Sequence, residues 1–408
     1  MSSPKPPRIL LLGYGGANNT GSEIRILTII DDMRAVFGAE AEITVATVDR
    51  EKTLRVLDES PVLKVVQLPY VFPLAVWRLV KGQDLLVLVE GSTFKDSWSS
   101  ALLYLFLWGA WCAQRQGKAS IAYAVDAGRM RPFNQRLTRL VCAGMDLIIT
   151  RTAAARDELR ALGVRREIHV TTDTAFQFRH QPAPAGGRVT VGCAPVEFHE
   201  WPVQFRLWAP PSRCYHWPYY FSWDEQRAAC SQELIETWAQ LICDIVRKRG
   251  WQVKLIAMEE LDRRICEKIA AQLPEDVRAQ VSACYAGEQT PQTIVAALRG
   301  LDYLLTSRYH ACVLSMDAAV PQLALYHDER LISIYRELGL ERFAIPHDAP
   351  DMAARLFAGF EQLVAQGTET QTHLRQQLDS YFMPRCYSNR SLLQQWQQGW
   401  SALKGAAA

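Results

Sequence analysis

The sequence predicts an α/β protein made of two Rossmann-like domains that face a central cleft. Its 408 residues are too many for one ordinary hydrophobic core and suggest two domains of roughly 200 residues. Short apolar runs alternate with amphipathic helical patterns, which is typical of a parallel sheet covered on both faces. The alternation restarts after a Pro- and Gly-rich segment, residues 180–187. We therefore expect an N-terminal domain over residues 1–180 and a C-terminal domain over residues 187–408, and ligands in the cleft between them.

The first domain opens with an apolar strand, residues 8–12, then a glycine-rich turn and a helix over about residues 22–37. The further strands of this domain are expected, in order, at residues 42–48, 63–68, 84–90, 120–125, 146–150 and 167–171.

The second domain begins with a strand at residues 188–194, and its next long helix has one apolar face. That face is formed by Leu234, Trp238, Leu241, Ile242, Ile245 and Val246. Its remaining strands are expected at residues 252–258, 281–285, 302–305 and 322–326. From Met352 the pattern is helical, so we assign the C-terminal helices to the second domain.

The composition indicates a soluble cytoplasmic protein. The chain is 49% hydrophobic and 22% charged with a net charge of +2, which gives no reason to expect a nucleic-acid partner. Its ten cysteines are scattered without a CxxC pair, so we expect reduced core thiols and no metal site. No secretory signal is visible at the N-terminus. The apolar run 101–112 is too short to span a bilayer. It is typical of a buried helix, and the alternative is peripheral contact at the inner face of a membrane.

A glycine-rich segment lies between the first strand and the first helix, where backbone N–H groups can receive an anion. Its key residues are Gly13, Tyr14, Gly16, Asn19, Gly21 and Glu23. It is not a dinucleotide fingerprint, because Asn18 occupies the last glycine position and Asp49 lies too far along the chain. The alternative is that the glycines only permit a tight turn.

Polar residues also follow three later strands, at the edge where doubly wound sheets bind ligands. Gly91, Ser92 and Asp96 follow the strand at 84–90, although a plain turn explains them equally well. Arg151 follows the strand at 146–150, where it could bind a ligand, and the alternative interpretation is that it is a solvated surface arginine.

The most informative segment, residues 307–310, reads Ser-Arg-Tyr-His and follows the strand at 302–305. Arg308 offers a permanently charged, two-pronged contact to a carboxylate or phosphate, and His310 can donate a proton near neutral pH. We therefore expect an anion site that carries its own acid.

An aromatic segment, residues 201–223, follows the first strand of the second domain. Its rings Trp217, Tyr219, Tyr220 and Trp223 are candidates for stacking against a sugar. The alternative is a small satellite core under a long loop.

In this order, the motifs resemble those of the polysaccharide pyruvyl transferase family. The family's opening Gly-Tyr-Tyr-Gly-x-x-Asn-x-Gly-Asp-Glu pattern is matched by the glycine-rich segment, and its glycine-rich strand end with a nearby Asp by Gly91 and Asp96. The segment 151–163 is similar to its Arg-Asp-x-x-Ser-x-x-x-Leu-x-x-Leu-Gly, and 307–311 to its Ser-Arg-x-His-Ala. The family pattern continues with a small residue and Pro, then a strand that ends in Tyr, and then a basic residue. The segment 319–330 is similar to this continuation.

The resemblance implies a GT-B-like fold and a transferase that moves the enolpyruvyl group of phosphoenolpyruvate onto two hydroxyls of one sugar, giving a pyruvate ketal. It implies Arg308 and Arg151 as donor clamps, one from each domain, with Ser307 and Tyr309 beside them. His310 is then the general acid. Phosphoenolpyruvate serves as co-substrate, with no cofactor or metal.

The acceptor implied is a sugar of a polysaccharide or its precursor, such as a lipid-linked one, bound on the side of the N-terminal domain. For the base, Glu90, Asp96 and Asp126 remain alternatives.

This chain departs from the family pattern at four positions. Ser22, Thr152 and Ala155 stand where the family has Asp, Asp and Ser, and Arg330 stands where Lys is usual. Two other functions stay open. One is a glycosyltransferase that uses a nucleotide sugar, whose diphosphate Arg308 and the helix at His310 would hold. The other is a non-catalytic protein that binds glycans or anions, for which the substitutions at Ser22, Thr152 and Ala155 would signal lost chemistry.

Overall fold

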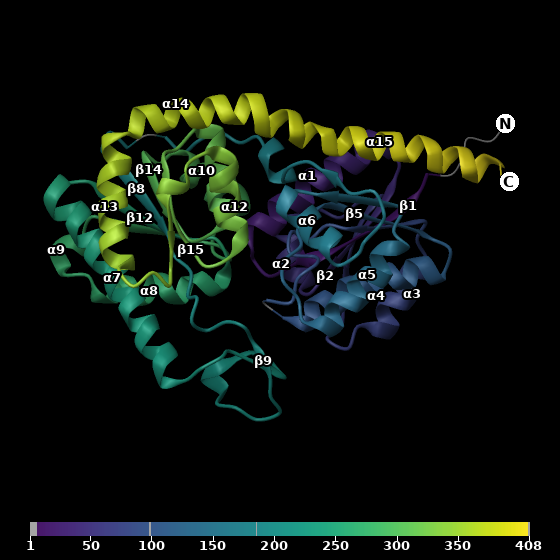
Figure 1. The fold of residues 1–408 in the computed structure, drawn as a ribbon, viewed down its shortest axis with the longest axis horizontal. Helices are drawn as coiled ribbons and strands as arrows, with labels where there is room; N and C mark the ends of the chain where they lie inside the picture. The colour runs from purple at the N-terminus through teal and green to yellow at the C-terminus, as the bar shows by residue number, and fades with distance from the viewer. Residues whose placement is uncertain (1–5, 98, 185, 407–408) are drawn as a thin grey trace. The chain divides into compact units, whose positions relative to one another are not determined.

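The computed structural model describes residues 6–97, 99–184 and 186–406 and divides into two compact units. The first unit comprises the chain up to Phe178 and again from Ser380, and the second comprises Arg179–Asp379. Each contains one parallel sheet with helices on both faces (Figure 1). The predicted pair of Rossmann-like domains is thus confirmed, and the cleft between them stays a prediction.

The sheet of the first unit has seven parallel strands in the order β3-β2-β1-β4-β5-β6-β7. They are β1 Arg8–Gly15, β2 Glu42–Thr47, β3 Leu63–Gln67, β4 Leu85–Leu88, β5 Ala119–Val125, β6 Leu147–Thr150 and β7 His169–Val170. The strand order reverses beside β1, because β2 and β4 pair with its two sides. In such sheets the carboxyl ends beside the reversal form a ligand-binding edge.

The two faces of this sheet are covered by different helices. The helices of the unit are α1 Thr20–Phe37, α2 Arg50–Leu54, α3 Pro73–Lys81, α4 Ser100–Arg115, α5 Pro132–Ala143, α6 Ala153–Ala161, the 3-10 helix Thr174–Gln177 and α15 Met383–Ala406. Leu10 and Leu12 of β1 pack into a core with α3, α4, α5 and α6. Ile9 and Leu11 point the other way, into a core with α1 and α15.

The C-terminal helix α15 belongs to the first unit, which corrects the prediction of one domain over residues 187–408. The helices that follow β3, β4, β5 and β6 all cover one face of the sheet, so the opposite side of β4, β5 and β6 needs another helix. Leu393 of α15 is fully buried there with Val87 and Ile149. Asn389 Nδ2 also donates to the Thr172 carbonyl, at 3.0 Å.

The sheet of the second unit has six parallel strands in the order β13-β12-β8-β14-β15-β16. They are β8 Thr190–Ala194, β12 Gln252–Ala257, β13 Val281–Tyr285, β14 Tyr303–Thr306, β15 Gln322–Tyr326 and β16 Ala344–Pro346. All of them except β16 were predicted from the sequence, and the three residues of β16 carry too little pattern to be recognised. Here the order reverses beside β8, which lies between β12 and β14.

The second unit also contains the helices that join these strands. They are α7 Glu225–Arg249, α8 Arg263–Gln272, α9 Glu275–Arg278, α10 Pro291–Arg299, α11 Tyr309–Ser315, α12 Glu329–Leu338, α13 Met352–Ala365 and α14 Gly367–Gln377. Short 3-10 helices lie at Pro211–Arg213, Glu260–Asp262, Met316–Ala318 and Glu341–Phe343. A π-helical turn, Leu378–Phe382, follows α14.

The aromatic segment before α7 forms a small antiparallel sheet that the sequence analysis did not predict. Its strands are β9 Gln204–Phe205, β10 Cys214–His216 and β11 Tyr219–Tyr220, in the order β10-β11-β9. Strands of two or three residues hold few side chains, so alternation cannot reveal them.

No helix within the described residues combines the length and the apolar content needed to cross a lipid bilayer.

Candidate functional site

The carboxyl ends of the strands in each unit gather the polar residues that the sequence analysis singled out. In the first unit, the segments after β1, β4, β5 and β6 meet at one edge of the parallel sheet. In the second unit, the segments after β8, β12, β14, β15 and β16 do the same.

Arg151 lies in a buried ion-pair network at the edge of the first unit. Its Nη1 donates to Asp173 Oδ2 at 2.6 Å, and its Nη2 to Asp126 Oδ2 at 3.0 Å. Arg25, from α1, donates from Nη1 to the other oxygen of Asp173 at 2.7 Å. Both arginines and Asp173 are fully enclosed. Removing one member would leave an uncompensated buried charge, so the network stabilises this edge of the fold.

This arrangement differs from the prediction that Arg151 is a donor clamp. Only 1% of the residue is exposed, and two carboxylates occupy its guanidinium. The solvated alternative is equally wrong. The position after β6 was predicted correctly, but Asp126 and Asp173 follow neighbouring strands and reach the guanidinium from both sides.

The three acids considered as bases all have protein partners. Asp126 pairs with Arg151, and Asp96 accepts from Asn134 Nδ2 at 2.6 Å and from the Arg131 backbone N–H at 3.0 Å. Glu90 Oε2 accepts from the Tyr14 backbone N–H at 3.3 Å. These bonds hold the loop ends together, and they do not single out one acid as a base.

The glycine-rich segment between β1 and α1 is also tied to Glu90. Ser22 donates from its hydroxyl to Glu90 Oε2 at 3.2 Å, and its backbone N–H donates to Asn19 Oδ1 at 3.1 Å, which caps α1. Gly16 has a φ of +81° and lies so close to Asp49 that a Cβ would be 2.4 Å from its carbonyl oxygen. Backbone geometry therefore requires this glycine, and acceptor binding by the segment stays a prediction.

Several other predicted residues lie in these same loops. Tyr14 is the next-to-last residue of β1, and Gly21 and Glu23 are buried in the first turn of α1. A Cβ on Gly13 would lie 2.7 Å from Val89 Cγ2, and one on Gly91 would lie 2.7 Å from Arg151 Nη1. Ser92 is half-buried and its backbone N–H donates to Glu90 Oε1 at 3.4 Å. Close packing thus explains Gly13 and Gly91.

Arg308 is the central residue of the second unit's edge. It lies two residues after β14 and is the N-cap residue of α11. Its Nε donates to Asp262 Oδ2 at 2.7 Å, and its Nη2 contacts Asp262 Oδ1 and, at 3.0 Å, Glu259 Oε2. Among the residues that the structure describes, Nη1 has no hydrogen-bond partner. The side chain is 16% exposed, so one edge of the guanidinium is fixed and the other can bind a ligand.

The two acids also determine the charge of this arginine. Burial by itself would lower the pKa of Arg308, but the charges and hydrogen bonds of Asp262 and Glu259 outweigh it and raise that pKa above its ordinary value. The guanidinium therefore stays positive at every physiological pH, as an anion site requires.

The neighbours of Arg308 on the chain supply further polar groups. The Ser307 hydroxyl is buried and has no hydrogen-bond partner among the described residues, so it is ready to bond a ligand or a water molecule. Tyr309 is buried. His310 lies in the first turn of α11 and is half-buried, with its ring 5.2 Å from that of Tyr309 in an edge-on arrangement. Arg308 and His310, which are two residues apart in the sequence, thus lie at one edge, as predicted.

Three histidines that the sequence analysis missed surround Phe198 at this edge. The Phe198 ring lies 4.6 Å from His327, which follows β15, and 4.9 Å from His347, which follows β16. His199 lies 6.0 Å from His347. Burial lowers the pKa of His199, and its electrostatic interactions with His347 and Arg227 lower that pKa further. Within the described residues, no group of three or more His, Cys, Asp or Glu side chains is arranged to hold a metal ion.

The sequence left two alternatives for the aromatic segment, sugar stacking and a small satellite core, and different rings of the segment fit different alternatives. Tyr220 is only 7% exposed and pairs with Cys214 and Gln204 in the small sheet, so its prediction as a sugar-stacking ring is wrong. Tyr219 is half-buried against Phe205. Trp217 and Trp223 are exposed, and the prediction of sugar stacking remains for them.

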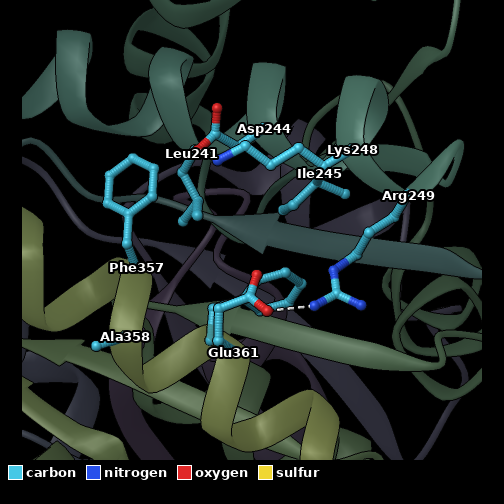
Figure 2. Close-up of a pocket in the computed structure, with 9 residues that line it drawn as sticks. Leu241, Asp244, Ile245, Lys248, Arg249, Phe357, Ala358 and Glu361 are labelled. Atoms are coloured by element: carbon cyan, nitrogen blue, oxygen red, sulfur yellow. Dashed lines mark hydrogen bonds and ion pairs between the residues drawn. The ribbon is translucent and has the colours of Figure 1, made fainter.

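A separate cavity of about 490 Å³ lies between α7 and α13 (Figure 2). Apolar and charged side chains line it, and the guanidinium of Arg249 pairs with Glu361. Arg249 precedes β12, so this cavity lies toward the amino ends of the strands and away from Arg308 and His310. None of the predicted site residues lines it.

Arg25, Asp173, Asp262 and Glu259 were also missed, although each left a signal in the sequence. Asp173, Glu259 and Asp262 follow strands, by the same rule that identified Arg151. Arg25 is a charged residue flanked by Ile24 and Ile26 on a helix whose apolar side must be buried. A buried charge requires a partner, so this position pointed to an internal ion pair.

Solved structures share this fold at low sequence identity. A putative UDP-N-acetylglucosamine 2-epimerase from Listeria monocytogenes has a TM-score of 0.56 at 13% identity, over 91% of each chain. UDP-GlcNAc 2-epimerase from Neisseria meningitidis, bound to UDP-GlcNAc, has a TM-score of 0.56 at 8% identity, over 96% of this chain and 100% of the other. A glycosyltransferase from Rickettsia africae has a TM-score of 0.54 at 9% identity, over 97% and 99%. At these identities the likeness concerns the fold alone, which is GT-B-like.

Family membership rests on the sequence. No protein with a curated description matches this chain. The model of the family described as polysaccharide pyruvyl transferase matches residues 19–329, from the cap of α1 to the start of α12. The match includes the segment 307–311 and, at the two edges, Arg151 and Arg308 with their acidic partners. The chain therefore belongs to the polysaccharide pyruvyl transferase family, a family of transferases.

Proposed function

We propose that the protein transfers the enolpyruvyl group of phosphoenolpyruvate to two hydroxyls of a sugar and so forms a pyruvate ketal. The observation that carries the proposal is Arg308, with one edge held by Asp262 and Glu259 and with Nη1 open to a ligand. Two further donors lie beside it, the buried Ser307 hydroxyl and the His310 ring. This set suits a small donor that carries both a carboxylate and a phosphate.

In the proposed reaction, Arg308 binds an acidic group of the donor and His310 protonates its methylene carbon. That proton makes C2 electrophilic, and the oxygen of one sugar hydroxyl forms a bond to it. The bond from C2 to the phosphate oxygen then breaks, and the second hydroxyl closes the ketal at C2. The donor carbon keeps one proton as part of a methyl group, and the hydroxyl protons return to His310 and to the departing phosphate.

The test is to incubate the purified chain with phosphoenolpyruvate and a panel of sugar acceptors, including lipid-linked ones. We expect release of inorganic phosphate together with the gain of one pyruvyl group on the sugar. Mass spectrometry of the sugar detects that gain. The same incubation with UDP-sugars as donors tests the alternative function of a glycosyltransferase. Transfer of a sugar from a UDP-sugar, without phosphate release from phosphoenolpyruvate, would identify a glycosyltransferase. Donor binding without turnover would identify a non-catalytic relative.

Substitution of His310 separates its role from a structural one. We expect His310→Ala to lower kcat by about 10²–10⁴-fold, since a positioned general acid contributes that much, while donor affinity changes little. The control is His180→Ala, which removes an exposed histidine outside both edges. Equal turnover of His310→Ala and the control would exclude His310 as the acid.

Substitution of Arg308 tests donor binding. Arg308→Lys keeps a charge for Asp262 but cannot hold both acids and a ligand, because an ammonium lacks the planar fork of a guanidinium. We expect KM for phosphoenolpyruvate to rise by about tenfold or more with a smaller change in kcat. Alanine is unsuitable here, since it would leave Asp262 without its counter-ion.

A further inference from the structure

We propose that one helical face of the first unit binds the surface of an anionic lipid bilayer. The face is formed by the loop before α3 and by α3, α4 and α5, which lie side by side over the sheet (Figure 1). Its large exposed apolar residues are Tyr70, Val71, Leu74, Tyr104, Trp111, Phe133 and Leu140. We call this set, with the basic residues around it, the basic apolar face.

The apolar residues of this face are unusually open to solvent. Val71 is 83% exposed, Tyr70 78% and Leu140 66%. The helices that carry them are joined beneath, so the residues share one surface. Trp108 of α4 donates from Nε1 to the Pro73 carbonyl at 2.9 Å, and Tyr104 donates from its hydroxyl to Asn134 Oδ1 at 2.9 Å. Several large exposed apolar groups gathered on adjacent helices are typical of an interaction site.

The charged residues within the segments that form this face are all basic. Residues 69–83, 99–116 and 127–145 contain seven Arg and Lys residues and no Asp or Glu. All seven basic residues are exposed, among them Arg78, Arg136 and Arg139. Arg131 pairs with Asp96, which lies outside these ranges, and its side chain is still 71% exposed. Because the whole chain carries only +2, the rest of it is net negative, and the positive charge is concentrated here.

This combination favours a lipid surface over other partners. Anionic headgroups attract clustered Arg and Lys, while Trp and Tyr partition to the level of the headgroups and aliphatic side chains reach the acyl boundary. A second copy docked on the same face would bring seven positive charges against seven. A nucleic acid would satisfy the arginines but would offer nothing to Val71 and Leu74.

The experiment is co-flotation of the full chain with vesicles, and it needs no substrate. One set of vesicles is phosphatidylcholine alone, and the other is an equal mixture of phosphatidylcholine and phosphatidylglycerol. We expect binding to the mixed vesicles only, weakened by added salt because the charges are exposed. Since no turnover is measured, the result is independent of the proposed reaction.

Two double variants test the two components of the face. R136E/R139E and V71S/L74S should each lower binding to the mixed vesicles by about tenfold or more. The matched controls are R336E/R355E, with the same change of charge on the second unit, and F205S/L207S, which removes exposed apolar groups from the aromatic segment. Both controls should bind like the wild type, and circular dichroism should show all four folded.

Several results would overturn the proposal. They are an absence of binding to mixed vesicles, an equal loss in the controls, or unchanged binding of V71S/L74S. Binding of duplex DNA as tight as that of vesicles, and insensitive to V71S/L74S, would assign the face to a polyanion. A dimer in sedimentation that V71S/L74S dissociates, with no vesicle binding, would assign it to a second copy.

Discussion

At the scale of single residues, buried charge determines which predicted positions can meet a ligand. Arg151 and Arg308 both follow strands and both pair with two acids. Arg151 is enclosed, whereas Arg308 keeps Nη1 unbonded among the described residues. The difference arises from the surrounding acids, which lie on both sides of Arg151 and on one edge of Arg308.

The first residue-scale prediction concerns Gly91, which packs against the Arg151 guanidinium. A Cβ at this position would lie 2.7 Å from Nη1, so Gly91→Ala must displace a buried ion pair. We expect a loss of about 1–3 kcal/mol in the free energy of unfolding, measured with urea. Gly82→Ala is the control, because its Cβ would make only an ordinary 3.6 Å contact. A Gly91 variant as stable as this control would show that the network tolerates the shift.

At the scale of elements, the face that a helix covers matters as much as its presence. The sequence indicates a helical C-terminus, but α15 packs on a sheet formed by residues more than two hundred positions earlier. Its contacts include Leu393 in the core and Arg390 Nε with Asp32 Oδ1 at 2.8 Å.

We therefore expect Leu393→Ala to cost about 2–5 kcal/mol in the free energy of unfolding, since it opens a cavity under the first sheet. Gln394→Ala, on the exposed side of the same helix, should change stability by less than about 0.5 kcal/mol. Equal stabilities of the two variants would contradict the placement of α15 in the core.

At the scale of the whole molecule, each unit has its own parallel sheet and its own buried apolar residues. The two core clusters that contain α4 and α15 are formed only by residues of the first unit. Damage to one of these cores should therefore stay within that unit.

Hydrogen exchange followed by mass spectrometry can check this expectation with the Leu393→Ala variant. Amides of β1, β4 and β6 should exchange faster than in the wild type, because their strands lie under the new cavity. Amides of β8 and β14, in the second unit, should exchange at unchanged rates. A uniform increase in both sheets would mean that the chain unfolds as one cooperative system.

The sequence by itself determined what depends on local pattern and chemistry. Alternating apolar runs located twelve of the thirteen strands of the two parallel sheets, and the rule of strand ends located Arg308 and His310. The motifs in their order, with the glycine-rich segment and the segment 307–311 as the most specific of them, also indicated the family that the comparison confirmed. Each of these signals is formed by residues that lie close together in the sequence, so it can be recognised without knowledge of the folded structure.

Only the tertiary structure decided which groups from distant segments meet. It enclosed Arg151 between Asp126 and Asp173, placed α15 on the first sheet, and surrounded Phe198 with histidines from three strand ends. It also brought the basic apolar helices together on one face. The physical reason is that burial and ion pairing depend on distances in space, and a pattern along the chain specifies only where each strand and helix begins and ends.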